Sequence, residues 1–525
     1  MTGLATTVGN NLAGLVAPHV GSDRLAYLDL TADPSSPRSV SYDEFDDRCG
    51  RVASGLRARG LGPGTRVAIM ADNSVDYAAL YLGIVRQGLV TVPLNTRVSA
   101  DTLRYVCRDA AVRLVFHDAA HAAMVPVGYD RVEIGSPAWD DLLSSAPAPV
   151  AEVDPGDVAV QMYTSGSTGR PKGVLLSHRS QLFTVGQYTS GGFFMDRGER
   201  ILVSAPMYHK NAMVQTKVCL AMGGEIVLLA RFDARAYLQA VARHGVTSLT
   251  GVPTMFALMT AERDLLGELD LTSVRRMMIG SAPMTETLFD QVQKLFPDAT
   301  ITNGYGTTEV IAVFGGHPQG LPRPKITIGH PLASVDVRLV DPAGGDVAFE
   351  SLHGEVTSPP TVAAEAEGEL WVRGPGTLNG YHRLPEVTAE RFTDGWYHTG
   401  DTMRRDANGW FFFVGRVDDM FVCGGENVFP GEVEHTLERH PAVHQAAVVA
   451  VADDVKGALP VAFVVPEPGQ SLTETDVKQW ALEHGPAFQH PRAVWVVDEI
   501  PLAGTAKVDK LALADEARRR FTPRS

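Results

Sequence analysis

At 525 residues the chain is too long for a single compact core, so we expect at least two domains. Hydrophobic residues make up 45% of the sequence and charged residues 20%, which is typical of a folded globular protein and excludes a collagen-like or disordered chain. The formal net charge of -15 argues against nucleic acid as a partner, because proteins that bind phosphate backbones present a basic face.

The cysteines and the N-terminal residues indicate the compartment. Cys49, Cys107, Cys219 and Cys423 lie far apart and form no CxxC pair, so we expect reduced thiols rather than a disulfide or zinc framework. The first twenty residues, MTGLATTVGNNLAGLVAPHV, have no basic start and no long apolar run. They predict neither a signal peptide nor a membrane span, and we expect a cytoplasmic protein.

The first half of the chain alternates short apolar runs with helical patterns. The spacing predicts a strand over Val67–Met70, a helix over Val75–Gln87 and a strand over Leu89–Val92. The same order returns where a predicted strand over Val158–Tyr163 leads into a glycine-rich loop, and where a strand over Arg276–Ile279 precedes a helix. This alternation predicts a mixed α/β architecture with largely parallel sheets and helices.

The later part of the chain follows a different pattern. Between Gly344 and Glu369 a Pro-Pro pair, small residues and acidic groups predict an exposed loop. After Gly415 the periodicity predicts a small α+β domain of about one hundred residues. Its expected helices are Gly431–Arg439 and Glu474–His484, and its expected strands are Ala446–Val451, Val461–Val465 and Ala493–Val497. We therefore expect a large N-terminal α/β domain over residues 1–415 and a small C-terminal domain over residues 416–525.

One segment has the composition of a phosphate-binding loop. Residues 163–174 read YTSGSTGRPKGV and bring hydroxyl groups, glycine backbone and a lysine into one short stretch. The segment is not a GxxxxGK[ST] P-loop, because Lys172 stands between Pro171 and Gly173. It is not a GxSxG nucleophile elbow either, because Ser165 stands two residues before Ser167. The segment thus predicts an oligophosphate site of another kind, with a flexible serine–glycine connector as the alternative.

With this loop the chain resembles the adenylate-forming superfamily of acyl-CoA synthetases, luciferases and peptide-synthetase adenylation domains. Further motifs of that superfamily follow in order, so the resemblance extends over nearly the whole chain. They are PMYH at 206–209, NGYGTTE at 303–309, YHTGD at 397–401, GRVDD at 415–419, CGGENVFP at 423–430 and GTAK at 504–507. The resemblance implies a ligase of the acyl-CoA synthetase type that forms an acyl-AMP from a carboxylic acid and ATP.

The resemblance also implies roles for particular side chains. Glu309 and Thr164 would hold Mg²⁺, and Lys507 would neutralise charge on the carboxylate and the α-phosphate. Tyr305 would stack on adenine, with Ser281, Ala282 and Pro283 as the opposing wall. Asp401 would accept hydrogen bonds from the ribose hydroxyls. The implied ATP-binding set is Thr164, Ser165, Gly166, Ser167, Thr168, Gly169, Lys172, Ser281, Ala282, Pro283, Asn303, Gly304, Tyr305, Gly306, Thr307, Thr308, Asp401, Arg416 and Lys507.

The implied acid pocket follows from the segment PMYHKNAM at 206–213. Peptide-synthetase adenylation domains place an aspartate there to hold the substrate ammonium, and this chain has no carboxylate in the segment, which argues against an α-amino acid. His209 stands where acyl- and aryl-CoA ligases keep an aromatic or imidazole gate, and we count it with Lys507 and Glu309 among the catalytic candidates. The implied acid-binding residues are His209, Lys210, Asn211, Val214, Gly251, Met255, Gly304 and Val310, which form a largely apolar set.

The small domain, which carries Lys507 for the first step, would also take part in the second step, the transfer to CoA. Asp418 resembles the hinge residue about which that domain rotates, and Gly424 and Gly425 would then line the tunnel for the pantetheine of CoA. One departure concerns this step: many CoA ligases carry a basic residue where Gln489 stands, and either His490 or Arg492 would have to replace it.

Three hypotheses follow. The first is an acid:CoA ligase that acts on a hydrophobic aliphatic, alicyclic or aromatic acid, with ATP, Mg²⁺ and CoA. The second is a stand-alone adenylating enzyme that passes its acyl-AMP to a carrier protein or a partner enzyme. The third is an inactive nucleotide-binding scaffold, which the retained Glu309, Asp401, Arg416 and Lys507 oppose. A luciferase-like oxygenase shares the motifs, and assembly into a homo-oligomer is a further expectation to test.

Overall fold

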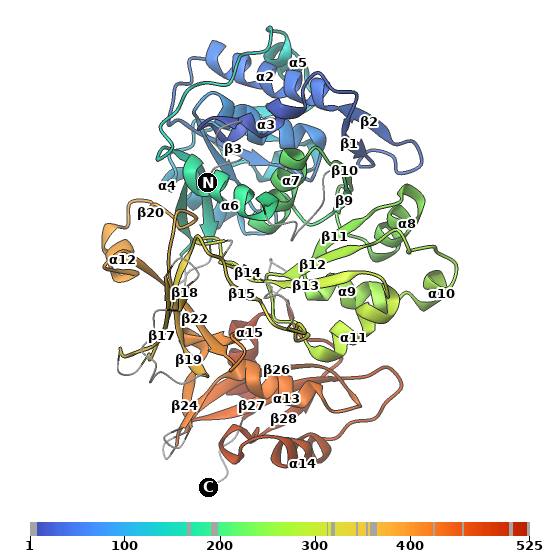
Figure 1. Cartoon of the computed structure of the whole chain (residues 1–525), viewed down its shortest axis with the longest axis vertical. Coiled ribbons are helices and arrows are strands. Elements are labelled where there is room, and N and C mark those ends of the chain that lie inside the picture. Colours follow the sequence, from blue (N-terminus) through green and yellow to red (C-terminus); the bar gives the residue numbers. More distant parts are fainter. Residues whose placement is uncertain are drawn as a thin grey trace. The chain divides into compact units, whose positions relative to one another are not determined.

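The computed structural model describes residues 8–164, 170–190, 198–311, 313–316, 321–342, 345–352, 355–356, 365–423, 426–453, 456–502 and 508–521. The chain forms two compact units, which are treated separately below and are coloured along the sequence in Figure 1. The first unit comprises Met1–Ser281, Val292–Gly315 and Arg373–Tyr397, and the second comprises Ala282–Gln291, Gly316–Val372 and His398–Ser525.

Within the described residues, the first unit contains two seven-stranded sheets. In one sheet the strand order is β13-β12-β11-β9-β10-β1-β2, and every neighbouring pair except β1 and β2 is parallel. Its strands are β1 (Leu25–Asp29), β2 (Arg38–Ser41), β9 (Arg200–Val203), β10 (Glu225–Leu228), β11 (Ser248–Gly251), β12 (Arg276–Gly280) and β13 (Thr300–Gly304). The carboxyl ends of β11, β12 and β13 therefore lie at one edge, where ligands of open α/β sheets bind.

The other sheet of the first unit has the order β20-β8-β7-β4-β3-β5-β6. Its pairs from β7 to β6 are parallel, whereas β8 is antiparallel to both of its neighbours. Its strands are β3 (Arg66–Met70), β4 (Val90–Pro93), β5 (Leu114–His117), β6 (Asp130–Glu133), β7 (Val158–Thr164), β8 (Lys172–Ser177) and β20 (Gly380–Tyr381). Nearby, the short β21 (Phe392–Thr393) pairs with Trp396 and Tyr397 at the start of β22 (Trp396–Arg405).

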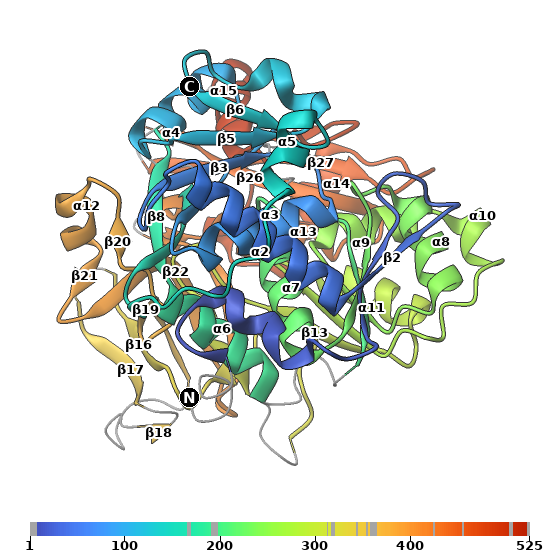
Figure 2. The same ribbon diagram turned by 90° about the horizontal axis from the view of Figure 1, so that it is seen from above.

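Helices cover both sheets of the first unit. In Figure 2, α2 (Tyr42–Ala58) lies along α3 (Val75–Arg86), and α3 packs on β3 and β4. The other helical segments are η1 (Leu12–His19), α4 (Ala100–Asp109), η2 (Ala119–Met124), α5 (Pro137–Leu143), α6 (His178–Ser190), α7 (Lys210–Met222), α8 (Ala234–His244), α9 (Pro253–Thr260), α10 (Arg263–Leu266) and α12 (Pro385–Glu390). Helix α11 (Glu286–Leu295) and strand β14 (Phe314–Gly316) are divided between the units.

Local sequence signals set the ends of these helices. Helix α2 begins with a capping box, in which the Ser41 hydroxyl accepts from the Glu44 backbone and the Glu44 carboxylate accepts from the Ser41 backbone. Helix α7 follows His209 and ends at Gly223, whose φ of 69° is a left-handed conformation that glycine adopts without strain. This placement puts the residues from Lys210 onward, which the sequence assigns to the acid pocket, on the first turns of one helix.

The second unit contains a β-rich part and the C-terminal part. In the β-rich part the strand order is β18-β17-β16-β19-β22, and β23 pairs with β22. Its strands are β15 (His330–Pro331), β16 (Asp336–Val340), β17 (Val347–Leu352), β18 (Glu355–Val356), β19 (Ala366–Arg373), β22 (Trp396–Arg405) and β23 (Phe411–Arg416), followed by η3 (Val417–Asp419).

The C-terminal part forms a sheet of order β25-β24-β27-β26, with β28 on β27. Its core is built from fully buried side chains such as Val448, Val461 and Val464, covered by helices on β26. The elements are β24 (Phe421–Cys423), β25 (Glu426–Val428), α13 (Pro430–Glu438), β26 (Val443–Asp453), β27 (Gly457–Pro466), α14 (Glu474–His484), η4 (Ala487–Gln489), β28 (Val494–Val496) and α15 (Lys510–Arg520).

The structure has the predicted mixed α/β architecture, and the strands and helices expected from periodicity form within a few residues of the predicted bounds. The loop predicted between Gly344 and Glu369 is wrong in part, because β17 runs from Val347 to Leu352 and pairs antiparallel with β16. Alternation explains this strand, since Phe349 and Ser351 are buried between more exposed neighbours. The predicted domain boundary between residues 415 and 416 stays a prediction.

Two further observations concern the expected compartment. All four cysteines are buried free thiols. In the part of the chain that the structure describes, no helix is both long enough and apolar enough to cross a membrane.

Candidate active site

The glycine-rich loop is anchored by a β-hairpin. Strands β7 and β8 are antiparallel, and their register places Thr164 opposite Lys172 where the loop begins and ends. The hydroxyl of Tyr163 donates to Asp109 Oδ2 over 2.6 Å, which ties the hairpin to α4. Ser165, Gly166, Ser167, Thr168 and Gly169 lie outside the described residues, so the structure fixes the base of the predicted loop.

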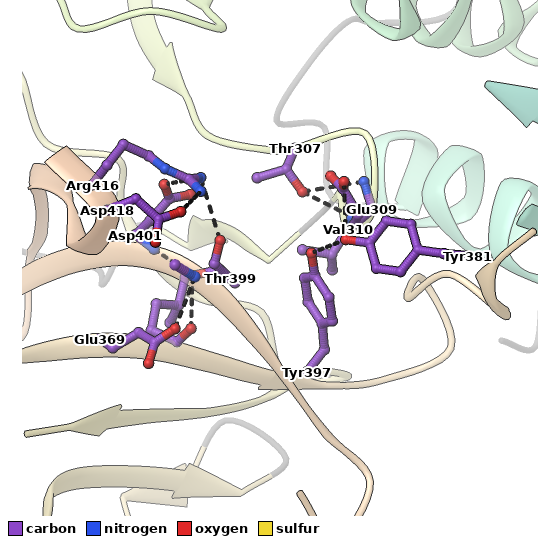
Figure 3. A network of polar contacts seen from close by, with 12 residues as sticks. Thr307, Glu309, Val310, Glu369, Tyr381, Tyr397, Thr399, Asp401, Arg416 and Asp418 are labelled. Carbon is purple, nitrogen blue, oxygen red and sulfur yellow. Dashed lines mark hydrogen bonds and ion pairs between the residues drawn. The ribbon is translucent and has the colours of Figure 1, made fainter. Parts of the chain in front are cut away.

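Glu309 lies in a turn that is closed by hydrogen bonds within residues 307–310. The backbone N–H of Thr307 donates to the Val310 carbonyl over 2.8 Å, and the Thr307 hydroxyl accepts from the N–H groups of Glu309 and Val310. The Tyr381 hydroxyl donates to Glu309 Oε1 over 3.2 Å and lies 3.2 Å from the Tyr397 hydroxyl, as drawn in Figure 3. Among the described residues Glu309 forms no ion pair. Its carboxylate therefore accepts from one neutral donor in the described part of the chain and keeps lone pairs that could bind a cation.

Tyr381 joins two motifs that lie far apart in the sequence. The ammonium of Lys172 lies 5.8 Å from the centre of the Tyr381 ring, within the range of a cation–π contact. The hydroxyl of the same tyrosine binds Glu309, whose charge, together with burial, raises the pKa of Tyr381 so that it stays a neutral donor. Tyr381 thus contacts both Lys172, the lysine of the predicted phosphate loop, and Glu309, the predicted metal ligand.

Lys210 is buried behind this turn. Its Nζ donates to the carbonyl oxygens of Thr307 and Thr308, and no carboxylate within ion-pair distance of it is described. Burial lowers the pKa of Lys210 to about 7, and the Glu309 charge opposes that shift. The side chain thus holds the backbone next to Glu309, whereas the sequence suggested a contact with the acid, a role that stays a prediction.

A second lysine of α7, Lys217, is buried about two helical turns after Lys210. Lys217 is 1% exposed, donates to Gln181 Oε1 and lies 5.6 Å from the centre of the Tyr81 ring. Burial lowers the pKa of Lys217 to about 7, and the like charge of Lys210 adds to the shift. Sequence reasoning missed Lys217, because a lysine in a helix normally faces water.

The predicted adenine wall lies at the carboxyl ends of β12 and β13. Ser281 follows β12 with a φ of 66°, a left-handed conformation that costs a non-glycine residue energy and recurs at ligand sites. Gly280 faces Gly304 in the β12–β13 register, and a Cβ on Gly280 would come within 2.5 Å of the Gly304 carbonyl. The half-buried ring of Tyr305 contacts Phe314, with 5.8 Å between ring centres. Of the predicted wall, Ala282 and Pro283 belong to the second unit.

The predicted acid-binding residues come from the start of α7, the ends of β11 and β13, helix α9 and the turn at Glu309. His209 precedes α7 and its ring lies 4.6 Å from that of Tyr208. Val214 and Met255 are buried, and Val310 is buried beyond the Glu309 turn. Apart from His209, the members of this set are Lys210, Asn211, Val214, Gly251, Met255, Gly304 and Val310, and all of them lie in the first unit.

Asp401 forms the centre of a polar cluster in the second unit, also drawn in Figure 3. Its Oδ1 accepts from Arg416 Nη1 over 2.7 Å, and its register partner across β22 and β23 is Arg416 itself. Arg416 also donates to the Thr399 carbonyl and lies 3.6 Å from a carboxylate oxygen of Asp418. Asp401 is thus a buried carboxylate whose charge is matched inside the chain.

Residues around this cluster support its geometry. Glu369 Oε1 accepts from the Gly400 N–H over 2.9 Å, and Gly400 has a φ of 71°. The Thr399 hydroxyl donates to the Leu370 carbonyl and accepts from the Asp401 N–H. Sequence reasoning missed Glu369 and Thr399, as it missed Tyr381, although Thr399 stands inside the YHTGD motif.

Three predicted residues of the C-terminal part lie outside the described residues. They are Lys507, assigned to the first step, and Gly424 and Gly425, assigned to the second. Gln489 is 9% exposed, and its amide donates to Glu432 Oε2 over 2.7 Å. The neighbouring His490 ring nitrogen lies 3.0 Å from Arg492 Nη1. The position that is basic in many CoA ligases is therefore turned inward here and bound to a carboxylate.

Two family matches cover most of the chain. Residues 17–382 match the AMP-binding enzyme family, and residues 432–507 match the AMP-binding enzyme C-terminal domain. The chain belongs to the AMP-binding enzymes. It is an AMP-forming acid–thiol ligase of the acyl-CoA synthetase type, within the adenylate-forming superfamily that the motifs predicted.

Individual relatives match along their whole length. The chain is 34% identical over 492 residues to a feruloyl-CoA synthase of Amycolatopsis sp, covering 92% of this chain and 94% of that one. It is 30% identical over 504 residues to the fatty acid–[acyl-carrier-protein] ligase ScoC of Streptomyces coeruleorubidus, with shares of 92% and 94%. The ATP-bound crystal structure of MatB from Rhodopseudomonas palustris superimposes with a TM-score of 0.86 at 29% identity, over 98% of this chain and all of that one.

Proposed function

We propose that this enzyme activates a hydrophobic carboxylic acid other than an α-amino acid and transfers the acyl group to CoA. In the first step a carboxylate oxygen bonds to the α-phosphorus of ATP, the bond to the β-phosphate oxygen breaks, and pyrophosphate leaves. In the second step the thiol sulfur of CoA bonds to the acyl carbon, the thiol proton is lost, and AMP leaves. Family membership supports the overall reaction, and the acid and the acceptor are the proposed parts.

The observation that carries the proposal is the meeting of Lys172 and Glu309 on Tyr381. An oligophosphate needs cations, and a carboxylate beside it needs a metal ion to avoid repulsion. Lys172 supplies one cation directly, and Glu309 is positioned at the same side chain to hold another. If Glu309 had only a structural role, we would not expect a carboxylate that forms no ion pair among the described residues to lie beside a phosphate loop.

Glu309 fits the proposed Mg²⁺ site by its chemistry. Mg²⁺ commonly takes one or two carboxylates together with phosphate oxygens and water. No cluster of three or more His, Cys, Asp or Glu side chains that could hold a metal ion occurs in the described part of the chain. The other ligands would be the Thr164 hydroxyl, phosphate oxygens of ATP and water. Bound there, the ion would neutralise charge on the phosphates; Tyr381 orients the carboxylate, and Lys210 holds the backbone that carries it.

The proposed acid site uses α7 and the glycines of β11 and β13. The only charged group among its predicted members, Lys210, donates to two backbone carbonyls, so the described set offers no carboxylate for a substrate ammonium. The feruloyl-CoA synthase relative supports an acid with an aromatic group. Asp401, held by Arg416, would accept from the ribose of ATP.

A carrier-protein thiol is the second candidate acceptor. The inward position of Gln489, bound to Glu432, removes the side chain that assists CoA phosphate binding in many relatives. ScoC, the carrier-protein ligase described above, shows that relatives of similar identity include such enzymes. The first step is common to both candidates.

The decisive experiment measures pyrophosphate release over a panel of aliphatic, alicyclic and aromatic acids, with and without CoA. Mass analysis of the products separates the candidates. Acyl-CoA formation supports the proposal, whereas acyl-AMP that accumulates beside CoA and is consumed by an added carrier protein supports the second candidate. Folded protein that forms no acyl-AMP with any acid would refute both.

The two-step proposal also assigns Lys507 to the first step alone. Lys507→Ala is expected to impair adenylation far more than thioester formation from supplied acyl-AMP. Single-turnover assays of each half-reaction test this, and equal losses in both would contradict the assignment.

A further inference from the structure

Helix α7 carries two amide side chains that reach Ser281 and Met278. Asn211 and Gln215 stand four residues apart, so they lie on one face of the helix. Asn211 Nδ2 donates to Ser281 Oγ over 3.3 Å, and Gln215 Nε2 lies 3.3 Å from Met278 Sδ. This face therefore leans over the carboxyl half of β12, where the proposed acid site is located.

Two buried polar atoms there have no partner among the described residues. Gln215 is 2% exposed and its Oε1 accepts no hydrogen bond. Thr250 of β11 is 6% exposed and its hydroxyl is likewise unpaired. The β11–β12 register makes Thr250 the neighbour of Met278, the residue whose sulfur contacts Gln215. Buried polar groups without partners are rare and costly, so two beside one methionine require an explanation.

A flexible thioether covers a glycine beside these atoms. A Cβ on Gly304 would lie 3.2 Å from Met278 Cγ. Gly304 pairs with Gly280, two residues after Met278, so both lie on one face of the sheet. Thioether side chains are flexible and pack well against ring edges, so a planar ring that displaced Met278 would rest on the Gly304 backbone.

We infer that the acid is aromatic, that it carries a hydroxyl group, and that Gln215 and Thr250 bind this hydroxyl and determine the specificity for it. This inference rests on the proposed function and narrows its substrate class. A hydroxyl can donate to Gln215 Oε1 and accept from the Thr250 hydroxyl at once, so one group satisfies both unpaired atoms. The substrate hydroxyl also suits either orientation of the Gln215 amide, because a hydroxyl can both donate and accept a hydrogen bond.

The test compares acids that differ by one hydroxyl. Pyrophosphate release is measured for 4-hydroxycinnamate against cinnamate and for 3- and 4-hydroxybenzoate against benzoate. The wild-type enzyme is expected to prefer the hydroxylated member of at least one pair by about tenfold or more in kcat/KM, because a site built to bind a hydroxyl rejects the analogue without it. Gln215→Met is expected to bring that ratio close to one, and Thr250→Val to lower it by a smaller factor.

The ratio is internal to one preparation, so a partly folded variant still gives a valid result. Gln479→Met, a substitution of an exposed glutamine on α14 that bonds only Glu483, is the matched control and should keep the wild-type ratio. A wild-type enzyme without preference for any hydroxylated acid, or a Gln215→Met variant that keeps the preference, would overturn the inference.

Thermal stabilisation by the acids alone separates this inference from the proposed function. If no acid supports pyrophosphate release, the proposed function fails. The inference still stands in that case if hydroxylated acids raise the melting temperature of the wild type more than their analogues do, and if Gln215→Met removes the difference. Equal shifts in the wild type would overturn it.

Discussion

Two regions of the molecule treat buried charge in opposite ways. Around Asp401, in the second unit, the carboxylate meets a guanidinium, since Arg416 Nη1 lies 2.7 Å away, and Asp418 lies 3.6 Å from the same guanidinium. Around Glu309, in the first unit, the carboxylate meets the neutral hydroxyl of Tyr381. The buried ammonium of Lys210 nearby meets carbonyl oxygens and no carboxylate within ion-pair distance is described.

The difference indicates what each region is prepared to bind. A carboxylate already balanced by arginine suits neutral donors such as ribose hydroxyls, because adding them requires no further charge. A carboxylate that forms no ion pair among the described residues suits a metal ion, whose binding then supplies positive charge. The Glu309 region is thus completed by its ligands, whereas the Asp401 region is complete in the fold.

The largest effect is expected from Glu309→Gln. The amide keeps the size and the Tyr381 contact but loses the negative charge, so adenylation should fall by about 10²- to 10³-fold, as for other lost electrostatic contacts. Pyrophosphate release at saturating acid, titrated with Mg²⁺, measures the effect. Glu386→Gln in α12 of the same unit is the control. An unchanged Mg²⁺ dependence would break the comparison between the two carboxylates.

Asp401→Asn should act on ATP binding. The amide leaves Arg416 without its buried charge partner, and loss of a charged hydrogen-bond pair should raise KM for ATP by about 10- to 100-fold. The Mg²⁺ dependence should stay that of the wild type, in contrast to Glu309→Gln. A change in kcat with an unaltered KM for ATP would contradict the ribose assignment.

Lys210→Met should loosen the backbone beside Glu309. Loss of two charge-assisted hydrogen bonds is expected to lower kcat/KM for ATP by about tenfold at pH 6.5. Because the pKa of Lys210 lies at about 7, the wild-type value should decline above that pH as the ammonium loses its proton, and the variant should lack this decline. A pH profile of both proteins measures it. Lys210→Arg should restore part of the activity, and a variant with the wild-type profile would refute the role.

Tyr381→Phe should have a smaller effect. It removes one neutral donor to Glu309 and keeps the ring beneath Lys172, so the loss should be about fivefold in kcat/KM, equivalent to one ordinary hydrogen bond. The apparent affinity for Mg²⁺ is the sensitive readout, because the phenol orients the carboxylate. A loss as large as that of Glu309→Gln would show that the hydroxyl does more than orient.

The last effect is on stability rather than activity and concerns Lys217. Its folded pKa of about 7 lies below its ordinary value of 10.5, so between these values the unfolded chain binds a proton that the folded chain does not. Stability from this group therefore rises with pH, by about 1.4 kcal/mol per pH unit in that window. Urea unfolding of the wild type and Lys217→Met from pH 8 to pH 9.5 should show a difference in unfolding free energy that grows with pH. Lys294→Met, on the surface of α11, should show none.

Much of the fold could be predicted from local pattern. The strand over Val158–Tyr163, the helix from Val75 and the helix over Glu474–His484 follow from apolar spacing and end signals, which act over a few residues. Strand β17 was missed because the surrounding Pro-Pro and acidic residues suggested a loop, and its pairing with β16 comes from a neighbour in space. Strand pairing depends on residues that are distant in the sequence. An alternation of only six residues is therefore a weak sequence signal for a strand.

The sequence by itself determined the family, because its motifs occur in order, and it determined which residues could carry charge to ATP. Only the tertiary structure decided which of those charges the fold neutralises. It placed Tyr381 in contact with both Lys172 and Glu309, paired Asp401 with Arg416, turned Gln489 inward and left Gln215 Oε1 without a partner among the described residues. The physical reason is that a motif fixes residue types, whereas burial and hydrogen bonding depend on side chains brought together from distant parts of the chain.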